Sequence, residues 1–415
     1  MTSTRTPTSE RIVSLDQFRG YTVLGMFLVN FVGSFSAAHW LLTHHNTFCS
    51  YADTIMPQFF FAVGFAFRLT MLRRAALSGV RAAQGRAIRR IAGLLLVALV
   101  IYTADRPAER WADLVRLGFW EAVRSPLKSD FFQTLTHIGV TSLWVLPVIR
   151  ASAGIRAGYL LASAALHVAV SHGFYFAWVN NGSPHGIDGG PLGFLTWTIP
   201  VLVGSLCADP FLGPARRLPA RRTAGWAVAL MALGYAMSCG TRFYDVAPAQ
   251  RGGPAVPRMA ACPVVPPREA VERAGAEWAA GDRTRLCCEP PFCPPPPSPD
   301  DAGDGERSRQ WNYWMMSQRG GTLSYQTFSA GFSVALFLLT HLLCDRRGWT
   351  LGLLRTLGTN ALAGYLLHLV VADAVQRFTP PDAPAWYMWS ACGLYLLVAY
   401  LLLRGLERAG IFIRL

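Results

Sequence analysis

LDQFRGYTVLGMFLVNFVG, residues 15–33, and DTIMPQFFFAVGFAFRLTML, residues 53–72, are two apolar runs with a short polar stretch between them. Each run has about the 20 residues that a helix needs to cross a hydrocarbon core roughly 30 Å thick. Similar runs recur along the chain, near residues 87–104, 130–149, 153–173, 189–208, 223–240, 321–344, 352–375 and 385–407. Transmembrane barrels show alternating segments of about 10 residues instead. The sequence therefore predicts an all-α polytopic membrane bundle of about ten transmembrane helices.

The composition agrees with an integral membrane protein. Of 415 residues, 52% are hydrophobic and only 15% are charged, and the mean hydropathy is positive. The first twenty residues are polar and the first apolar run is long enough to span, so no cleavable signal peptide is expected. We expect the chain to insert through its own helices and to reside in a bacterial inner membrane.

The net charge of the chain is +14, and the distribution of its arginines predicts the orientation in the membrane. Arginines gather in every second short loop, after the second, fourth, sixth and eighth apolar runs. Cytoplasmic loops carry such an excess of Arg and Lys, so both termini are predicted to be cytoplasmic. The arginines form no single stripe with interleaved aromatic residues, and no nucleic acid partner is expected. The stretch from His44 to Asp53 carries no Lys or Arg and falls on the outer side.

Three parts follow from this pattern. Residues 1–240 hold seven helices, residues 241–312 form an extracytoplasmic loop rich in Pro and Cys, and residues 313–415 hold three more helices of the same membrane domain. The loop contains Cys262, Cys287, Cys288 and Cys293. An oxidising exterior permits disulfides there, whereas the cysteine spacing fits no zinc pattern. No metal is expected.

The first helix shows a start signal and a stop signal. Ser14 and Gln17 match a capping box, and Asp16 lies in the first turn, where the helix dipole favours a negative charge. Asn30 follows about 21 Å further along the helix. Gly33 then weakens the helix, so the chain can turn back and return a histidine of the polar stretch towards Asn30.

His44 and His45 put titratable groups at a membrane surface. An isolated interfacial histidine is most simply an amphipathic anchor, but two adjacent ones suggest chemistry. A neutral imidazole can take a proton from an amine or hydroxyl, or can itself be acylated, near neutral pH. Asp53 opens the second helix, where simple N-terminal capping is the plain alternative to a functional role.

Other polar residues lie inside predicted helices, where they are costly and usually face a bundle interior or a wet cavity. Hydrogen bonding between helices is the alternative role for several of them. These residues are Gln133, His137, Ser324, Tyr325, Asn360 and His368.

Several motifs occur in a recognisable order. RIVSLDQFRG at residues 11–20 precedes Asn30, the histidine stretch and ADTIMPQFFFAVG at residues 52–64. Weaker matches follow at QTLTHIG (133–139), LSY (323–325) and GTNALAGYLLH (358–368). With these motifs the chain resembles the heparan-α-glucosaminide N-acetyltransferase family of membrane acyltransferases. The resemblance spans the helical part, and the Pro-rich loop has no counterpart.

The resemblance implies transfer of an acetyl group from cytoplasmic acetyl-CoA to an extracytoplasmic sugar amine or hydroxyl on a glycan or glucosamine-like acceptor. It implies catalytic roles for Asn30 and for His44 or His45. In the family a Trp and an Asn-Gly usually follow the histidine, and this chain lacks them. His44 is preferred because its separation from Asp53 is closer to that of the family.

The remaining site residues are assigned by position. Arg19 and the basic loops would hold the phosphates of the coenzyme, Asp16 and Asn360 would line its entry, and His368 would also contact it. The substrate or the tunnel would be lined by Asp53, Gln133, His137, Ser324 and Tyr325. The expected partners are the lipid bilayer and the acceptor glycan. The sequence leaves both a monomer and a homodimer as alternatives.

A secondary transporter is the alternative. In that case Gln133, His137 and His368 would bind a solute or relay protons. Such proteins have interrupted helices related by an internal repeat. Pro57 and Pro200 are candidate interruptions, but no repeat is found in the sequence. A structural membrane subunit without chemistry would leave the intramembrane histidines unexplained.

Overall fold

A computed structural model describes residues 12–102, 108–181, 184–213, 217–245, 259–280 and 310–413. This part of the chain is helical, and within it Met259 and Trp311 form an isolated bridge rather than a strand. The predicted all-α class is confirmed. Most of the Pro-rich loop, with Cys287, Cys288 and Cys293, lies outside the described residues.

The chain divides into two compact units. Unit 1 comprises residues 1–38, 218–224 and 335–414, and unit 2 comprises residues 39–217 and 225–334. Two of the boundaries fall inside helices, namely α9 (Ala220–Ser238) and α11 (Leu323–Thr340). Each unit therefore combines residues from the predicted N-terminal and C-terminal parts of the membrane domain.

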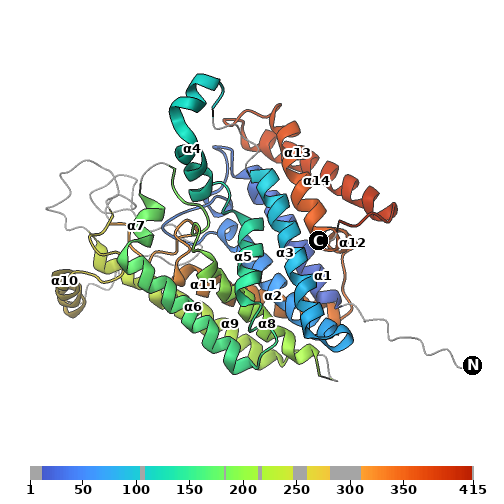
Figure 1. The fold of residues 1–415 in the computed structure, drawn as a ribbon, viewed down its shortest axis with the longest axis horizontal. Helices are drawn as coiled ribbons and strands as arrows, with labels where there is room; N and C mark the ends of the chain where they lie inside the picture. The colour runs from blue at the N-terminus through green and yellow to red at the C-terminus, as the bar shows by residue number, and fades with distance from the viewer. Residues whose placement is uncertain are drawn as a thin grey trace, which may run out of the picture. The chain divides into compact units, whose positions relative to one another are not determined.

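Helices occupy each of the ten predicted apolar runs (Figure 1). Those of unit 1 are α1 (Val13–Val32), the π-helical turn η6 (His341–Arg346), α12 (Gly352–Thr359), α13 (Ala361–Gln376) and α14 (Ala385–Arg408). Those of unit 2 are η1 (Trp40–Leu42), α2 (Tyr51–Ser78), α3 (Val80–Tyr102), α4 (Trp111–Lys128), α5 (Thr134–Val145), α6 (Ala153–Gly173), α7 (Tyr175–Asn180), α8 (Phe194–Ala208), η2 (Asp209–Phe211), η3 (Cys239–Tyr244) and α10 (Arg268–Ala279).

Six of the described helical segments are long and apolar enough to cross a membrane, and a bent pair of helices adds a seventh if it counts as one span. The six segments are Tyr51–Ser78, Ala153–Gly173, Phe194–Phe211, Ala220–Tyr244, Leu323–Arg346 and Ala385–Arg408. These helices make the chain a multi-pass membrane protein. Three predicted spans belong neither to these six nor to the bent pair. Of these, α1 and α3 carry charged residues, and α5 has only 12 residues.

Unit 2 is centred on the crossing of α2 and α8, which pack along each other (Figure 1). A Cβ on Gly64 would lie 1.8 Å from the carbonyl oxygen of Val201, and one on Gly204 would lie 2.1 Å from that of Phe61. The two glycines let the backbones touch, as small residues do between membrane helices. This contact fixes the direction of α2, whose first turn carries Asp53.

Unit 1 has a similar crossing of α1 and α12. A Cβ on Gly20 would lie 1.8 Å from the carbonyl oxygen of Leu354, and one on Gly358 would lie 1.9 Å from that of Asp16. Directly after Gly358 and Thr359 the chain bends by 94° between α12 and α13. Asn360 occupies the bend.

The predicted capping box at the start of α1 is wrong. The N-cap is Ile12, and no side chain caps this helix. Ser14 instead donates from its backbone N–H (3.1 Å) and its hydroxyl (2.5 Å) to the carboxylate of Asp345. The amide of Gln17 donates to the carbonyl of Leu351 and accepts from its N–H, both at 3.1 Å. Polar groups that suit a local cap serve long-range contacts here. The predicted end of the helix is confirmed, since α1 stops at Val32 with Gly33 as its C-cap.

Candidate active site

The polar stretch leads into a capping box at the start of α2. Ser50 is the N-cap, and its hydroxyl oxygen accepts from the backbone N–H of Asp53 at 3.3 Å. In return the Oδ2 atom of Asp53 accepts from the backbone N–H of Ser50 at 2.9 Å. A carboxylate at this place is stabilised by the helix dipole. Asp53 therefore does cap the helix, as the plain interpretation of the sequence expects.

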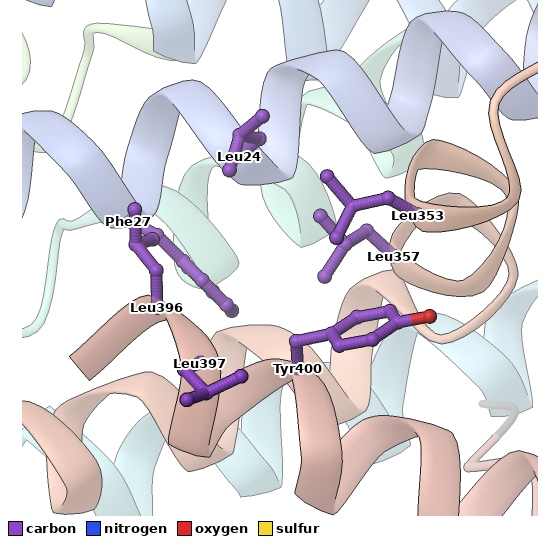
Figure 2. Close-up of a pocket in the computed structure, with 7 residues that line it drawn as sticks. All are labelled: Leu24, Phe27, Leu353, Leu357, Leu396, Leu397 and Tyr400. Atoms are coloured by element: carbon purple, nitrogen blue, oxygen red, sulfur yellow. The ribbon is translucent and has the colours of Figure 1, made fainter. Parts of the chain in front are cut away.

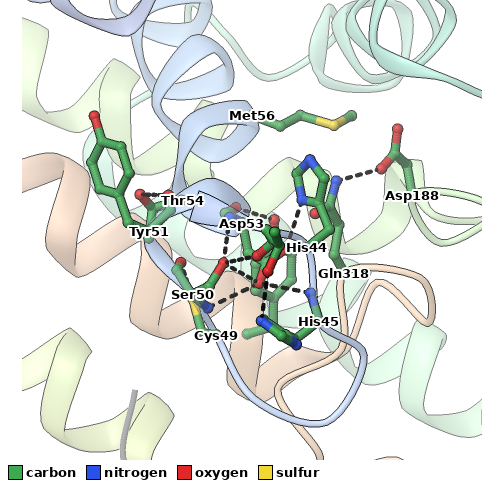
Figure 3. Close-up of polar contacts among 12 residues, drawn as sticks. His44, His45, Cys49, Ser50, Tyr51, Asp53, Thr54, Met56, Asp188 and Gln318 are labelled. Carbon is green, nitrogen blue, oxygen red and sulfur yellow. Dashed lines mark hydrogen bonds and ion pairs between the residues drawn. The ribbon is translucent and has the colours of Figure 1, made fainter. Parts of the chain in front are cut away.

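The same carboxylate also holds His44. Nδ1 of His44 lies 2.8 Å from Oδ1 of Asp53 (Figure 3). The Asp53 side chain is 1% exposed and the His44 side chain 53% exposed. Since Oδ1 acts as an acceptor, the bond keeps the imidazole proton on Nδ1 and leaves the lone pair of Nε2 free. This is the arrangement in which a carboxylate orients a histidine for proton or acyl transfer.

The surroundings of His44 favour its charged form. Desolvation by the surrounding protein acts to lower the pKa of His44, but the hydrogen bond and the charge of Asp53 outweigh it, with smaller contributions from Asp188 and Gln318. The net pKa is raised above its ordinary value of 6.5. His44 is thus a stronger base than a free histidine.

Asp188 and Gln318 belong to the site although sequence reasoning missed them. Nε2 of Gln318 donates to Oδ1 of Asp188 at 2.8 Å (Figure 3). Asp188 is 5% exposed, and burial raises its pKa to about 6. Each residue lies within two positions of a Gly-Gly pair, and the backbone N–H of Gly189 donates to the carbonyl of Arg319 at 2.9 Å. A polar residue close to a Gly-Gly pair in two loops is the sequence signal that could have pointed to them.

His45 has a different environment. Its Nε2 atom lies 2.8 Å from the carbonyl oxygen of Trp40 and 3.1 Å from the hydroxyl of Thr43. Its ring stacks on Phe48 with 4.2 Å between ring centres. These contacts hold the loop in shape and occupy the nitrogen that would otherwise reach a substrate.

Tyr325 is the predicted tunnel residue that the structure brings to this site. Its hydroxyl donates to the backbone carbonyl of Asp53 at 2.6 Å. Its neighbour Ser324 bonds to the carbonyls of Trp314 (3.0 Å) and Met315 (3.1 Å) and so acts locally.

The other two predicted tunnel residues lie at α5. Gln133 is the N-cap of α5 but caps it without its side chain. His137 is fully buried, and neither of its ring nitrogens has a hydrogen-bond partner. Its ring lies 6.1 Å from that of Trp197, which is equally far from the ring of Tyr325. Trp197 therefore links His137 to the residues that contact Asp53.

Asn30 pairs with His368 within unit 1. Nδ2 of Asn30 lies 3.2 Å from Nε2 of His368, whose Nδ1 bonds to the carbonyl of Tyr365 at 2.6 Å. The ring of His368 stacks on Phe27 at 5.6 Å. Asn30 and His44 belong to different units, so their predicted meeting stays a prediction.

The residues predicted to bind the coenzyme all lie in unit 1 but do not form one cluster there. Asp16 packs its carbonyl on Gly358 near Asn360, whereas His368 is with Asn30, about 21 Å along α1 from Asp16. Arg19 is in the same turn of α1 as Asp16. Asn360 donates to the carbonyl of Thr356 at 3.0 Å, and its Oδ1 atom is buried without a partner.

A pocket of about 190 Å³ lies between α1, α12 and α14 (Figure 2). Tyr400 is the one lining residue with a polar group. The pocket suits a hydrocarbon chain and offers nothing to phosphate groups. It is lined by Leu24, Phe27, Leu353, Leu357, Leu396, Leu397 and Tyr400. Within the described residues, no group of three His, Cys, Asp or Glu side chains is placed to hold a metal ion.

No family model matches this chain, and no curated protein is similar to it in sequence. Support for a function therefore comes from its own motifs and from the geometry around His44.

Proposed function

We propose that the protein is a transmembrane acyltransferase that moves an acetyl group from cytoplasmic acetyl-CoA to an amine or hydroxyl of an extracytoplasmic sugar. The observation that carries the proposal is the pairing of His44 with the buried carboxylate of Asp53. An exposed imidazole whose proton is held on Nδ1 has one reactive atom, Nε2. The motif resemblance supplies the donor and the acceptor class.

Two mechanisms use this atom. In the first, Nε2 takes a proton from the acceptor while the acceptor attacks the thioester carbon, and the C–S bond breaks to release coenzyme A, whose sulfur is protonated. In the second, Nε2 itself attacks the thioester carbon and the C–S bond breaks to release coenzyme A. The acetyl group on Nε2 then passes to the acceptor, whose proton goes to solvent. Asp53 stabilises the positive charge that the ring acquires in either case.

The topology in this proposal has ten spans, with both termini in the cytoplasm and His44 outside. It adds α1, α3, α5 and the bent pair α12–α13 to the six spans described above. The charged groups of α1 and α3 support this, because each helix keeps them in one half: Asp16 and Arg19 lie in the first two turns of α1, and the arginines of α3 all lie before Ile91, which leaves residues 91–102 uncharged. Charges near a helix end reach the interface at little cost. A bacterial inner membrane suits this orientation.

Coenzyme binding is the first test. We expect acetyl-CoA to raise the melting temperature of the detergent-purified protein in a saturable way, with coenzyme A weaker and ATP without effect. Acetyl transfer from labelled acetyl-CoA to glucosamine should then be seen with the wild type and lost in His44→Ala. A folded protein with no shift and no transfer would refute the proposal.

A secondary transporter is the second candidate, and two observations favour it. His137 has two buried ring nitrogens without hydrogen-bond partners. The axes of α12 and α13 make an angle of 94° at the break at Asn360. Broken helices and buried ionisable groups mark solute and proton sites in transporters. Proton-coupled uptake into proteoliposomes that is lost in His137→Ala, without any effect of acetyl-CoA, would support this function.

A further inference from the structure

The side chains of Asp188 and Gln318 form a pair beside His44 that no capping, packing or catalytic role described above explains. We propose that Gln318 is a positioning residue for His44, and that Asp188 fixes its amide so that the carbonyl oxygen faces the imidazole. This role rests on the proposed function of His44, because it concerns the state of that histidine during transfer.

The orientation of the Gln318 amide follows from its contacts. Its NH₂ group donates to Oδ1 of Asp188 at 2.8 Å, and a carboxylate oxygen can only accept. The amide therefore cannot reverse without placing two oxygens against each other. Its Oε1 atom is buried and has no hydrogen-bond partner among the described residues.

The loops that carry the pair are built for close approach. Asp188 has a positive φ of 54°, and Gly189 and Gly321 also have positive φ values, of 89° and 58°. A Cβ on Gly189 would lie 3.2 Å from the Cα of Gly321. The carbonyl of Asp188 also accepts from the indole N–H of Trp197 at 2.7 Å. These contacts hold Asp188 in a rare backbone conformation that presents its carboxylate to Gln318.

A hydrogen-bond acceptor held beside an imidazole interacts differently with the neutral and the protonated form of the ring. Neutral His44 has one N–H, which Asp53 already engages, whereas the imidazolium has two. The buried carbonyl oxygen of Gln318 therefore favours the imidazolium that forms when Nε2 takes a proton. The ionisable groups that act on His44 are Asp53 and Asp188, and Gln318 adds the effect of a side-chain hydrogen bond to the charged ring.

The test is the titration of His44 itself, which needs no substrate. Protein labelled with ¹³C at histidine Cε1 is titrated by NMR in detergent, and the His44 signal is assigned by its loss in His44→Gln. We expect Gln318→Leu to lower the pKa of His44 by about one unit, as loss of a hydrogen bond to a charged group would. Gln326→Leu is the matched control, because Gln326 is also a buried amide of unit 2 but does not act on His44. If Gln318→Leu fails to fold, Gln318→Asn, which withdraws the amide by one methylene, gives the same comparison.

A double-mutant cycle with Asp188→Ala, which removes both the charge and the acceptor of the Gln318 amide, separates orientation from charge. If Asp188 acts by fixing the amide, its substitution lowers the pKa of His44 much more in the wild type than in Gln318→Leu. Equal effects in both backgrounds, or no effect of Gln318→Leu, would overturn the proposal. The expected coupling in a protein that transfers no acetyl group would instead refute the transferase function and leave the positioning role intact.

Discussion

His44 and His45 are neighbours in sequence, yet they have different partners. Asp53 holds Nδ1 of His44 and leaves Nε2 free, whereas Nε2 of His45 lies against the carbonyl of Trp40. We therefore expect His44→Ala to reduce acetyl transfer by about 10² to 10⁴-fold, the usual contribution of a general base. His45→Ala should lower the melting temperature, but it should reduce the rate per folded molecule much less than His44→Ala does. Transfer assays and thermal unfolding of both variants check this, and a fully active His44→Ala would contradict it.

Asp53 makes the rate depend on pH in a defined direction. The transferring histidine needs an unprotonated Nε2, and its pKa is raised above 6.5. The rate should therefore rise with pH through a value above 6.5. Since a raised native pKa stabilises the fold only while the group is protonated, the contribution of His44 to stability is present below about pH 6.5 and is lost as pH rises through the native pKa.

Asp53→Asn should move this pH profile downwards and lower the maximal rate. The variant loses the charge that outweighs desolvation, and an amide can hold the ring in the wrong tautomer. Because Asp53 also caps α2, the measurement needs a control for the cap. Ser50→Ala removes the capping hydroxyl, which also donates to Oδ2 of Asp53 at 2.9 Å, and keeps the carboxylate. It should lower stability by about 1 kcal/mol and move the pH midpoint much less than Asp53→Asn does. A midpoint that is equal in Asp53→Asn and wild type would argue against the pairing.

At the scale of single helices, two glycines decide how closely α2 and α8 approach. Ala at position 204 would place its Cβ within 2.1 Å of the carbonyl oxygen of Phe61. We expect Gly204→Ala to destabilise the protein by roughly 1–3 kcal/mol or more, as overpacking does. Gly158→Ala in α6 is the control, since a Cβ added there would meet no neighbouring atom within 4 Å. That change should be neutral or stabilising by up to about 1 kcal/mol. Equal melting temperatures for the two variants would contradict the close contact.

Local sequence patterns predicted the helices better than their partners. The ten apolar runs and the stop at Gly33 follow from composition and spacing, and the structure has helices in each place. The hydroxyl of Ser14 suits a cap equally well by sequence, but it bonds to Asp345, 331 positions away. A pattern confined to a few residues cannot rank a local cap against such a distant carboxylate.

The candidate site shows the same limit. His44 and Asp53 are nine positions apart, so the pair could be proposed from the sequence. Asp188 and Gln318 come from loops separated by 130 positions, and a shared hydrogen bond joins them. Neither stands out in its own segment except by the nearby glycines. Only the fold reveals that they face one histidine.

At the scale of the whole molecule, the proposed reaction requires α1 to cross the membrane, although it is not among the six most apolar spans. Coenzyme A cannot cross a bilayer, so in the proposed reaction it binds from the cytoplasm, His44 acts at the outer face, and the thioester has to reach His44 through the membrane domain. Asp16 and Arg19 lower the mean hydropathy of α1, but both lie in its first two turns and leave Tyr21 to Val32 with Asn30 as the most polar residue. We predict that alkaline phosphatase fused after Thr47 is active and that a fusion after Ser78 is inactive, because the first is exported and the second stays in the cytoplasm. A green fluorescent protein at the C-terminus should fluoresce. An inactive fusion after Thr47 would place His44 on the cytoplasmic side together with the coenzyme. His44 could then not act on an extracytoplasmic sugar, and the proposed transfer across the membrane would be refuted.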